Sequence, residues 1–287
     1  MKELKYINSN GDELTFSTSW PFLLESFEQG TNVNNYSFKG SGQAGTRYVG
    51  NTLDKSDLTL KVAVNGSDRA EYSRNKEKLR RVFNPHFDEG YLIHSDDEKT
   101  LRIKCIPEKI PFMVDKSKTY GEGSIALTAN NPYWEDISET KEEIALWMGD
   151  FSFPLEIVSG GIEMGHRMPL LIVNAENKGD TESGMIIEFR ALATLTNPSL
   201  FNVNTRESIE ITKTMTAGEV IRINTYYAEE DVELISSGVT ANIFNIMKTG
   251  SKFLKLSKGD NLFRYDADSG LDNLVCSIYH RNLYLGV

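Results

Sequence analysis

The side chains that most often carry chemistry are sparse in this sequence and stand far apart. They comprise four histidines and two cysteines: His86, His94, His166, His280, Cys105 and Cys276. No two of them have the short spacing at which zinc ligands occur. The sequence also lacks a nucleophile elbow, a phosphate-binding loop and a dinucleotide-binding glycine motif. We therefore predict no catalytic residue, no metal site and no cofactor, and we expect that the chain is not an enzyme.

Two acidic clusters imitate functional motifs without completing them. The segment Asp266–Gly270 resembles a calcium-binding loop, but its glycine falls at the fifth position and no Glu follows at the twelfth. Asp96 and Asp97 could act as a glycosidase pair only with carboxyl groups about 5–10 Å apart across a cleft. We interpret both clusters as polar turns, because Asp and Gly favour turns.

The composition is that of a soluble globular protein, and it excludes two classes of function. The 287 residues suit about two domains of roughly 100–200 residues each. A formal net charge of −10 argues against a nucleic-acid clamp, because phosphate contacts need Lys and Arg. No apolar window is long enough to span a membrane, and Met1–Asn10 does not read as a signal peptide. Both cysteines lie in apolar, strand-like runs, so we expect reduced, buried thiols.

A seam divides the chain into two strand-rich halves of similar size. Asn131–Asp136 closes the first half, the acidic run Glu139–Glu143 follows, and Phe153–Ile157 opens the second. We therefore predict an N-terminal domain at 1–136, a linker at 137–150 and a C-terminal domain at 151–287.

The first half is predicted to contain several hairpins. The turn at Asn8–Asp12 contains Asn-Gly between strand-like runs, which is a strong hairpin signal. Residues 40–50 hold four glycines and predict a flexible loop or a protruding hairpin. Leu58–Val64 alternates as a strand does. The charged run Ser95–Lys99 predicts the tip of a further hairpin.

One helix is predicted over residues 69–83. Ser67 or Asp68 can cap its start, and Asn84-Pro85 ends it, because the residue before Pro avoids helical geometry. Its outer face carries six cations: Arg69, Arg74, Lys76, Lys78, Arg80 and Arg81. Nucleic-acid binding is one interpretation of that face. Interleaved glutamates and the acidic chain favour a solvated face or an interface with an acidic neighbour.

The second half is predicted to be almost entirely β, as in a β-sandwich of jelly-roll type. The candidate strands are 154–158, 169–173, 185–190, 200–203, 207–212, 220–225, 232–235, 253–256, 261–265 and 274–279. A short helical stretch is expected near Asn242–Lys248. The aromatic residues of this half are open to two interpretations, a sugar-stacking platform or a buried core, and their place in strand runs favours the core.

The order of these segments resembles the distal tail proteins, or Dit family, of long-tailed, non-contractile bacteriophages. In the first half the resemblance rests on Asn8–Gly11, the glycine-rich residues 40–50, the helix with its Phe83–Pro85 stop, Gly90–Leu92, Arg102–Ile103 and Asn131–Trp134. In the second half it rests on Phe153–Leu155, Leu256–Asn261 and Tyr284–Val287.

The resemblance implies a specific architecture and role. The N-terminal domain would be β-barrel-like or sandwich-like, with one helix and a protruding hairpin, and the C-terminal domain a galectin-like or jelly-roll sandwich. Six copies would form a ring that joins the tail tube to a tail-associated lysin, adhesin or baseplate protein. The chain would be made in the host bacterial cytoplasm and incorporated into the virion. Its second half leaves room for one sandwich and no inserted sugar-binding module.

A ring subunit needs head-to-tail contacts that close on themselves. We expect the glycine-rich arm to wrap a neighbouring copy, and the helix cations to meet an acidic neighbour. The predicted interface residues are Ser41, Gly42, Gln43, Gly45, Arg47, Tyr48, Arg74 and Arg81. The acidic chain would present a negative wall, so that genomic DNA passes through the ring without specific binding.

Two alternatives remain open from the sequence. A carbohydrate-binding module for attachment to the host surface would cluster exposed aromatic and polar residues on one sandwich face. An enzyme would require a cleft with paired carboxylates or a central histidine.

Overall fold

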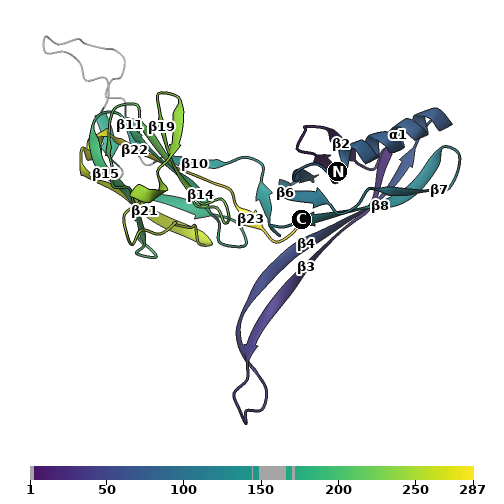
Figure 1. The fold of residues 1–287 in the computed structure, drawn as a ribbon, viewed down its shortest axis with the longest axis horizontal. Helices are drawn as coiled ribbons and strands as arrows, with labels where there is room; N and C mark the ends of the chain where they lie inside the picture. The colour runs from purple at the N-terminus through teal and green to yellow at the C-terminus, as the bar shows by residue number, and fades with distance from the viewer. Residues whose placement is uncertain (1–2, 144, 149–165, 170–171) are drawn as a thin grey trace. The chain divides into compact units, whose positions relative to one another are not determined.

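The computed structural model describes residues 3–143, 145–148, 166–169 and 172–287 (Figure 1). The chain divides into two compact units, Met1–Ile137 with Tyr284–Val287, and Ser138–Leu283. The sequence assigned the last four residues to the second domain, whereas the structure places them in the first unit. The predicted opening of the second domain, Phe153–Ile157, lies outside the described residues.

The first unit is built on one antiparallel sheet with a helix packed against it. The sheet order is β2-β1-β5-β6-β8-β4-β3, and β7 pairs with β8 while β9 pairs with β6. Its elements are β1 (Glu3–Ile7), β2 (Glu13–Phe16), β3 (Phe22–Phe38), β4 (Arg47–Asn65), α1 (Arg69–Val82), β5 (Gly90–Ser95), β6 (Thr100–Pro107), β7 (Phe112–Asp115), β8 (Tyr120–Ala129) and β9 (Trp134–Asp136).

The helix α1 forms where the sequence predicts it, and its start is doubly capped. The Asp68 carboxylate accepts a hydrogen bond from the Glu71 amide at 2.7 Å, and the Glu71 carboxylate accepts one from the Ser67 amide at 2.7 Å. Leu79 is fully buried, and the Phe83 ring that follows the helix stacks on Tyr6 with ring centroids 4.5 Å apart. These contacts hold α1 firmly on the sheet.

The last residues of the chain complete the first unit. Strand β23 (Leu283–Tyr284) pairs with β9. The Tyr284 ring joins the hydrophobic core of this unit and lies 4.4 Å from the Lys99 ammonium. Gln29 donates a hydrogen bond to the Leu285 carbonyl at 3.2 Å and accepts one from the Trp134 indole at 2.9 Å. The buried Trp134 is therefore linked through one amide to the end of the chain.

The second unit is a two-sheet antiparallel sandwich. One sheet runs β10-β22-β14-β18-β19-β20 and the other β13-β21-β15-β16, with β17 paired to β15 and the ribbon β11-β12 apart from both. The strands are β10 (Thr140–Glu143), β11 (Ala145–Met148), β12 (His166–Pro169), β13 (Ile172–Asn177), β14 (Met185–Ala191), β15 (Leu195–Asn202), β16 (Ser208–Glu210), β17 (Thr214–Met215), β18 (Val220–Asn224), β19 (Asp231–Ser236), β20 (Val239–Asn242), β21 (Gly259–Ser269) and β22 (Leu274–His280). The predicted fold class, mainly β with one α-helix, is confirmed.

Several predicted elements of this unit differ in detail. The predicted strand 253–256 is not a strand, because only Leu256 forms a single bridge, to Ser183. Residues Thr140–Glu143 of the predicted linker form β10, which pairs with β22 and so belongs to the sandwich. The short helical stretch near Asn242–Lys248 is a 3-10 turn, Phe244–Ile246, and a second such turn spans Leu271–Asn273. Strand 154–158 and residues 170–171 lie outside the described residues.

Candidate assembly surface

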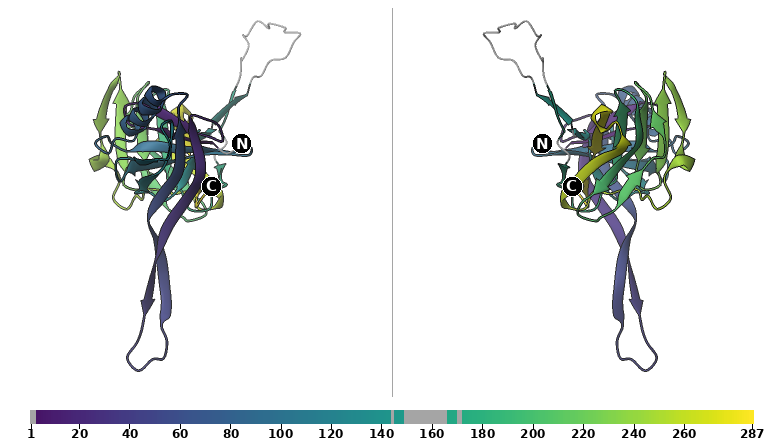
Figure 2. Two further views of the ribbon diagram at one scale, coloured as in Figure 1. Left: turned by 90° about the vertical axis from the view of Figure 1, so that its right-hand side faces the viewer. Right: turned by 90° about the vertical axis from the view of Figure 1, so that its left-hand side faces the viewer.

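Strands β3 and β4 extend beyond the sheet as a two-stranded ribbon, which we call the arm (residues 32–55; Figures 1 and 2). Ser56 is the last residue of β4, going outward, that pairs with β8. Beyond it, in the described part of the chain, the two strands pair only with each other. The sequence predicted a strand only from Leu58, and pairing with β3 extends it back to Arg47 despite Gly50, Asn51 and Asp54.

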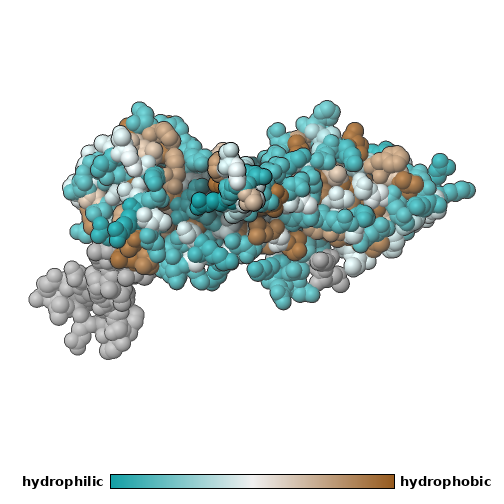
Figure 3. Space-filling model, turned by 90° about the horizontal axis from the view of Figure 1, so that it is seen from below, coloured by the Kyte–Doolittle hydropathy of each residue, from teal (hydrophilic) through white to brown (hydrophobic). Residues whose placement is uncertain are grey.

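The arm exposes large apolar side chains along its whole length. Val33, Tyr36, Phe38, Tyr48 and Val49 are between 47% and 68% exposed. A two-stranded hairpin is at best marginally stable alone in water. Single exposed apolar residues are ordinary, and hydrophobic residues reach the surface at several separate places (Figure 3). Their concentration on a ribbon without a core is what indicates a surface to be covered by a partner.

The register of the arm places its two strongest anchors on one face. Tyr36 lies opposite Gly50 and Phe38 opposite Arg47. The register irregularity between Tyr36 and Ser37 leaves Val49 of β4 as the extra residue, so alternation along β3 still directs Tyr36 and Phe38 to the same side. The Tyr36 hydroxyl and the Thr52 hydroxyl form a hydrogen bond at 3.1 Å, which fixes the orientation of the tyrosine ring. The arm therefore has an aromatic face.

Four of the predicted interface residues form the tip of the arm: Ser41, Gly42, Gln43 and Gly45. The Gln43 side chain accepts a hydrogen bond from the Gly40 amide, and the Gln43 amide donates to the Gly40 carbonyl, both at 3.2 Å. Gly42 and Gly45 have φ near +76° and +79°, which favours glycine. Arg47 and Tyr48 follow at the start of β4, so these six predicted residues are brought together.

The charge of the arm is opposite in sign to that of the chain. No Asp or Glu occurs between Glu28 and Asp54, whereas Lys39 and Arg47 lie in that interval. The outer arm is therefore cationic, although the whole chain carries −10. Such a surface favours contact with acidic groups of a partner.

The other two predicted interface residues, Arg74 and Arg81, lie on α1 and not on the arm. With Lys78 they occupy positions i, i+4 and i+7 of the helix and form one exposed cationic stripe. Within the described residues no ion pair involves these three cations. The α1 stripe is thus a second charged surface of the first unit.

One helix cation is not part of that solvated face. The Lys76 ammonium lies 2.8 Å from the Asp115 carboxylate and 4.4 Å from the centre of the Tyr72 ring. The Tyr72 hydroxyl donates to the same carboxylate at 2.5 Å. These two hydrogen bonds hold the pKa of Asp115 below its usual value. The expectation that all six cations face solvent is wrong for Lys76, which ties α1 to β7.

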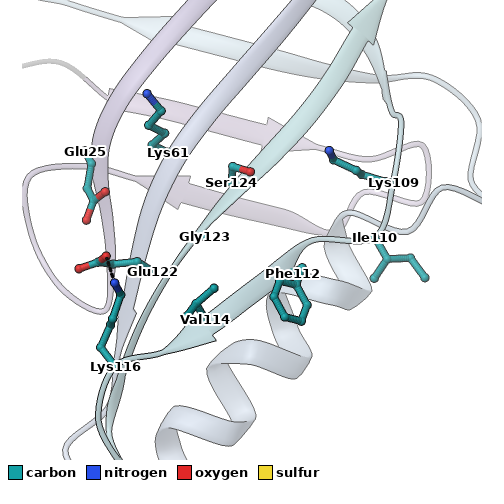
Figure 4. Close-up of a pocket in the computed structure, with 10 residues that line it drawn as sticks. All are labelled: Glu25, Lys61, Lys109, Ile110, Phe112, Val114, Lys116, Glu122, Gly123 and Ser124. Carbon is teal, nitrogen blue, oxygen red and sulfur yellow. Dashed lines mark ion pairs between the residues drawn. The ribbon is translucent and has the colours of Figure 1, made fainter.

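The structure reveals an apolar edge that the sequence analysis missed. Ile110, Phe112 and Val114 are all exposed, and we call them the β7 ledge (Figure 4). Phe112 is the most exposed, at 72%. Phe112 and Val114 are two residues apart on β7 and lie on one face, with Ile110 just before the strand, and that alternation is the signal that could have revealed the ledge.

The β7 ledge borders a shallow hollow of about 510 Å³. Gly123 and Ser124 of β8 form its floor, and charged side chains surround it (Figure 4). A Cβ at Gly123 would collide with the Phe112 carbonyl oxygen, so glycine there allows β7 to lie close to β8. The surrounding residues are Glu25, Lys61, Lys109, Lys116 and Glu122. Lys61 pairs with Glu28 at 2.8 Å and Lys116 with Glu122 at 3.3 Å.

The side chains that could carry out catalysis or bind a metal do not converge in the structure. Within the described ranges, no group of three His, Cys, Asp or Glu side chains could hold a metal. Cys105 and Cys276 are both free and buried, and burial raises the pKa of the Cys105 thiol to about 12. His94 packs edge-on against Trp134, and the side chain of His166 lies outside the described residues. No helix in the described residues is long and apolar enough to cross a membrane.

The outer faces of the sandwich sheets offer no row of open aromatic rings among the described residues. On one sheet, the Phe201 ring lies 5.7 Å from the Arg264 guanidinium. On the other, the Tyr279 ring lies 5.8 Å from the Lys141 ammonium. Tyr227 is open but occupies a turn. This arrangement does not favour the carbohydrate-binding alternative.

Comparison with known proteins identifies both halves of the chain. Residues 9–129 match the family model described as a phage tail protein RIFT-related domain. Residues 178–284 match the model described as the C-terminal domain of a siphovirus-type tail component. A comparison with curated protein sequences finds no significant match.

Solved structures that share this fold include a phage hub protein and chains of a phage baseplate. The Dit protein of phage SPP1, described as a paradigm of the hub adsorption apparatus in phages infecting Gram-positive bacteria, aligns with a TM-score of 0.70 at 11% identity, over 99% of this chain and 100% of its own. A chain of the phage p2 baseplate in its activated conformation with Ca aligns over 100% of both chains with a TM-score of 0.57 at 11% identity. The same baseplate with Sr gives 0.55, also at 11% identity and with complete coverage of both chains.

Proposed function

Since this chain is a siphophage distal tail protein, a hub component of the phage tail, we propose that six copies form a ring at the distal end of the tail tube. One face of the ring contacts the tube. The other carries the baseplate, or the tail-associated lysin or adhesin. The chain is made in the host bacterial cytoplasm, enters the virion, and acts by binding proteins and not by catalysis.

The observation that carries this proposal is the arm. A closed ring is built from heterologous contacts, in which one surface of each copy meets a different surface of the next. A ribbon that leaves its own sheet and exposes an aromatic face is suited to reach a neighbouring copy. We propose that Ser41, Gly42, Gln43, Gly45, Arg47 and Tyr48 lie in that subunit contact.

Arg74 and Arg81 serve a different contact in this proposal. They lie on the α1 stripe, away from the arm, and their charge suits an acidic surface of the tail tube or of the hub partner. The similarity of the fold to a baseplate component and to a hub of an adsorption apparatus supports contacts on both sides of the ring.

The distribution of charge bears on how DNA would pass the ring. Residues 1–137 contain 18 Lys and Arg against 20 Asp and Glu, and residues 138–283 contain 13 against 21. Most of the net negative charge therefore belongs to the second unit. We propose that the genome passes without specific binding through a ring of nearly neutral first units, with the α1 stripe turned away from the lumen.

The test is the mass and shape of the purified full-length chain. Light scattering and negative-stain imaging should reveal a closed ring of six times 32.3 kDa, about 194 kDa. If the ring needs its tail partners to form, it should appear on adding the tube protein. A chain that stays monomeric at high concentration, both alone and with tail partners, would refute the proposed ring.

A further inference from the structure

We propose that the β7 ledge is the receiving surface for the arm of a second copy. This inference rests on the proposed ring, because it names the two surfaces that meet in each subunit contact. The arm supplies one of them. The ledge of Ile110, Phe112 and Val114 supplies the other, on the same unit of the next copy.

A heterologous ring requires such a second surface in addition to the arm. Each copy must offer one patch that reaches out and a different patch that is reached. Trp20, exposed elsewhere in this unit, already packs edge-on against Tyr120 with ring centroids 5.9 Å apart. The β7 ledge, in contrast, combines two exposed apolar side chains of β7, Phe112 and Val114, with Ile110 just before the strand.

Charge excludes the α1 stripe as the receiving surface. The outer arm carries Lys39 and Arg47 and no acidic residue, so the stripe would repel it. The hollow beside the ledge is mixed in charge, because Glu25 and Glu122 lie on its border together with Lys61, Lys109 and Lys116. Lys61 pairs with Glu28 and Lys116 with Glu122, which leaves Glu25 and Lys109 without an ion pair among the described residues. A cationic, aromatic ribbon therefore finds apolar contact and one open carboxylate, Glu25, at the ledge.

The backbone at the ledge is also open to pairing. In the described residues, β7 pairs only with β8, so its other edge has free hydrogen-bonding groups. Beyond Ser56 the outer edges of both arm strands are open in the same way. An extended segment that adds to a sheet edge gains main-chain hydrogen bonds, and side-chain contacts then set its register.

The β7 ledge is held in place before any partner arrives. Met113, between Phe112 and Val114, points into the core and is 5% exposed. Asp115, at the end of β7, accepts hydrogen bonds from Tyr72 and Lys76 of α1. A receiving surface that is already ordered loses little conformational entropy when the arm binds.

Cysteine cross-linking of the full-length chain tests the inference directly. Both native thiols are buried, so introduced cysteines react selectively. Phe112→Cys is combined in one chain with Tyr36→Cys, Phe38→Cys or Tyr48→Cys, and the ring is treated with a short bismaleimide. We expect a ladder of covalent oligomers ending at six for at least one arm position. The matched control combines Arg81→Cys with the same arm positions and should give no ladder.

A second variant tests the inference if the bismaleimide cannot span the distance between the two introduced cysteines. Phe112→Ala should fold as the parent does, because its side chain is largely exposed, and should raise the dissociation constant of the ring about tenfold or more. A ring of normal mass and affinity with no arm-to-112 cross-link would overturn the ledge inference and leave the proposed ring intact. A chain that forms no ring under any condition would overturn both.

Discussion

Truncating the aromatic face of the arm should weaken assembly of the ring without destabilising the folded monomer. In the variant Tyr36→Ala with Phe38→Ala, the monomer should keep its stability within about 0.5 kcal/mol, because both side chains are exposed and contact no core. The dissociation constant of the ring, in contrast, should rise strongly.

The size of the assembly effect follows from the area that a neighbour would cover. Tyr36 is 53% exposed and Phe38 is 63% exposed, which leaves roughly 100–150 Å² of each available for burial. At about 25 cal/mol per Å² this corresponds to an upper limit of about 4 kcal/mol for each side chain. Ordering costs reduce the gain, so we expect about 2 kcal/mol for each residue. The double variant should raise the dissociation constant of the contact roughly 1,000-fold.

Sedimentation velocity over a dilution series measures the assembly, and thermal unfolding of the diluted monomer measures the fold. Tyr227→Ala is the matched control, since Tyr227 is 82% exposed but lies in a turn of the second unit. It should change neither quantity. The reasoning fails if the double variant assembles as the parent does, or if its monomer loses more than about 1 kcal/mol.

Three further predictions concern the fold of the single chain. Leu79→Ala should lower the free energy of unfolding by about 2–5 kcal/mol in urea titrations, because this fully buried side chain anchors α1. A smaller loss would mean that neighbouring side chains collapse into the cavity left by the leucine. The pKa of Asp115 is lowered in the folded state by Lys76 and Tyr72, so its stabilising effect is present above the unfolded pKa and is lost as the pH falls below about 4. Asp115→Asn should therefore flatten the acid limb of unfolding curves below about pH 4, and an unchanged limb would contradict the hydrogen bonds. Cys105 and Cys276 should resist alkylation in the native protein and react on denaturation, as followed by mass spectrometry, and rapid native labelling would show that they are accessible.

The sequence predicts local features well where one residue decides them. Asp68 and Pro85 bracket α1 because capping and the geometry before proline act within a few residues. The glycines of the arm tip indicate a turn because two of them need positive φ. These signals do not depend on the rest of the fold.

Features set by distant pairing were harder to predict. The inner part of β4 is stabilised by β8 and its outer part only by β3, so the strand extends through residues of low β-propensity. The alternation of Phe112 and Val114 is visible in the sequence, but only the strand pairing shows that β7 lies at a sheet edge. Arg74 and Arg81 were predicted as interface residues of the helix, and the structure places them on α1, on a surface separate from the arm.

The return of Tyr284 to the first unit has a consequence for biosynthesis. Because this ring and the Leu285 carbonyl belong to the core and hydrogen-bond network of the first unit, that unit cannot be finished while the ribosome is still translating the sandwich. Chains interrupted before residue 284 would carry an arm on an incomplete scaffold. Premature polymerisation of nascent chains is thereby delayed until translation has passed the whole second unit.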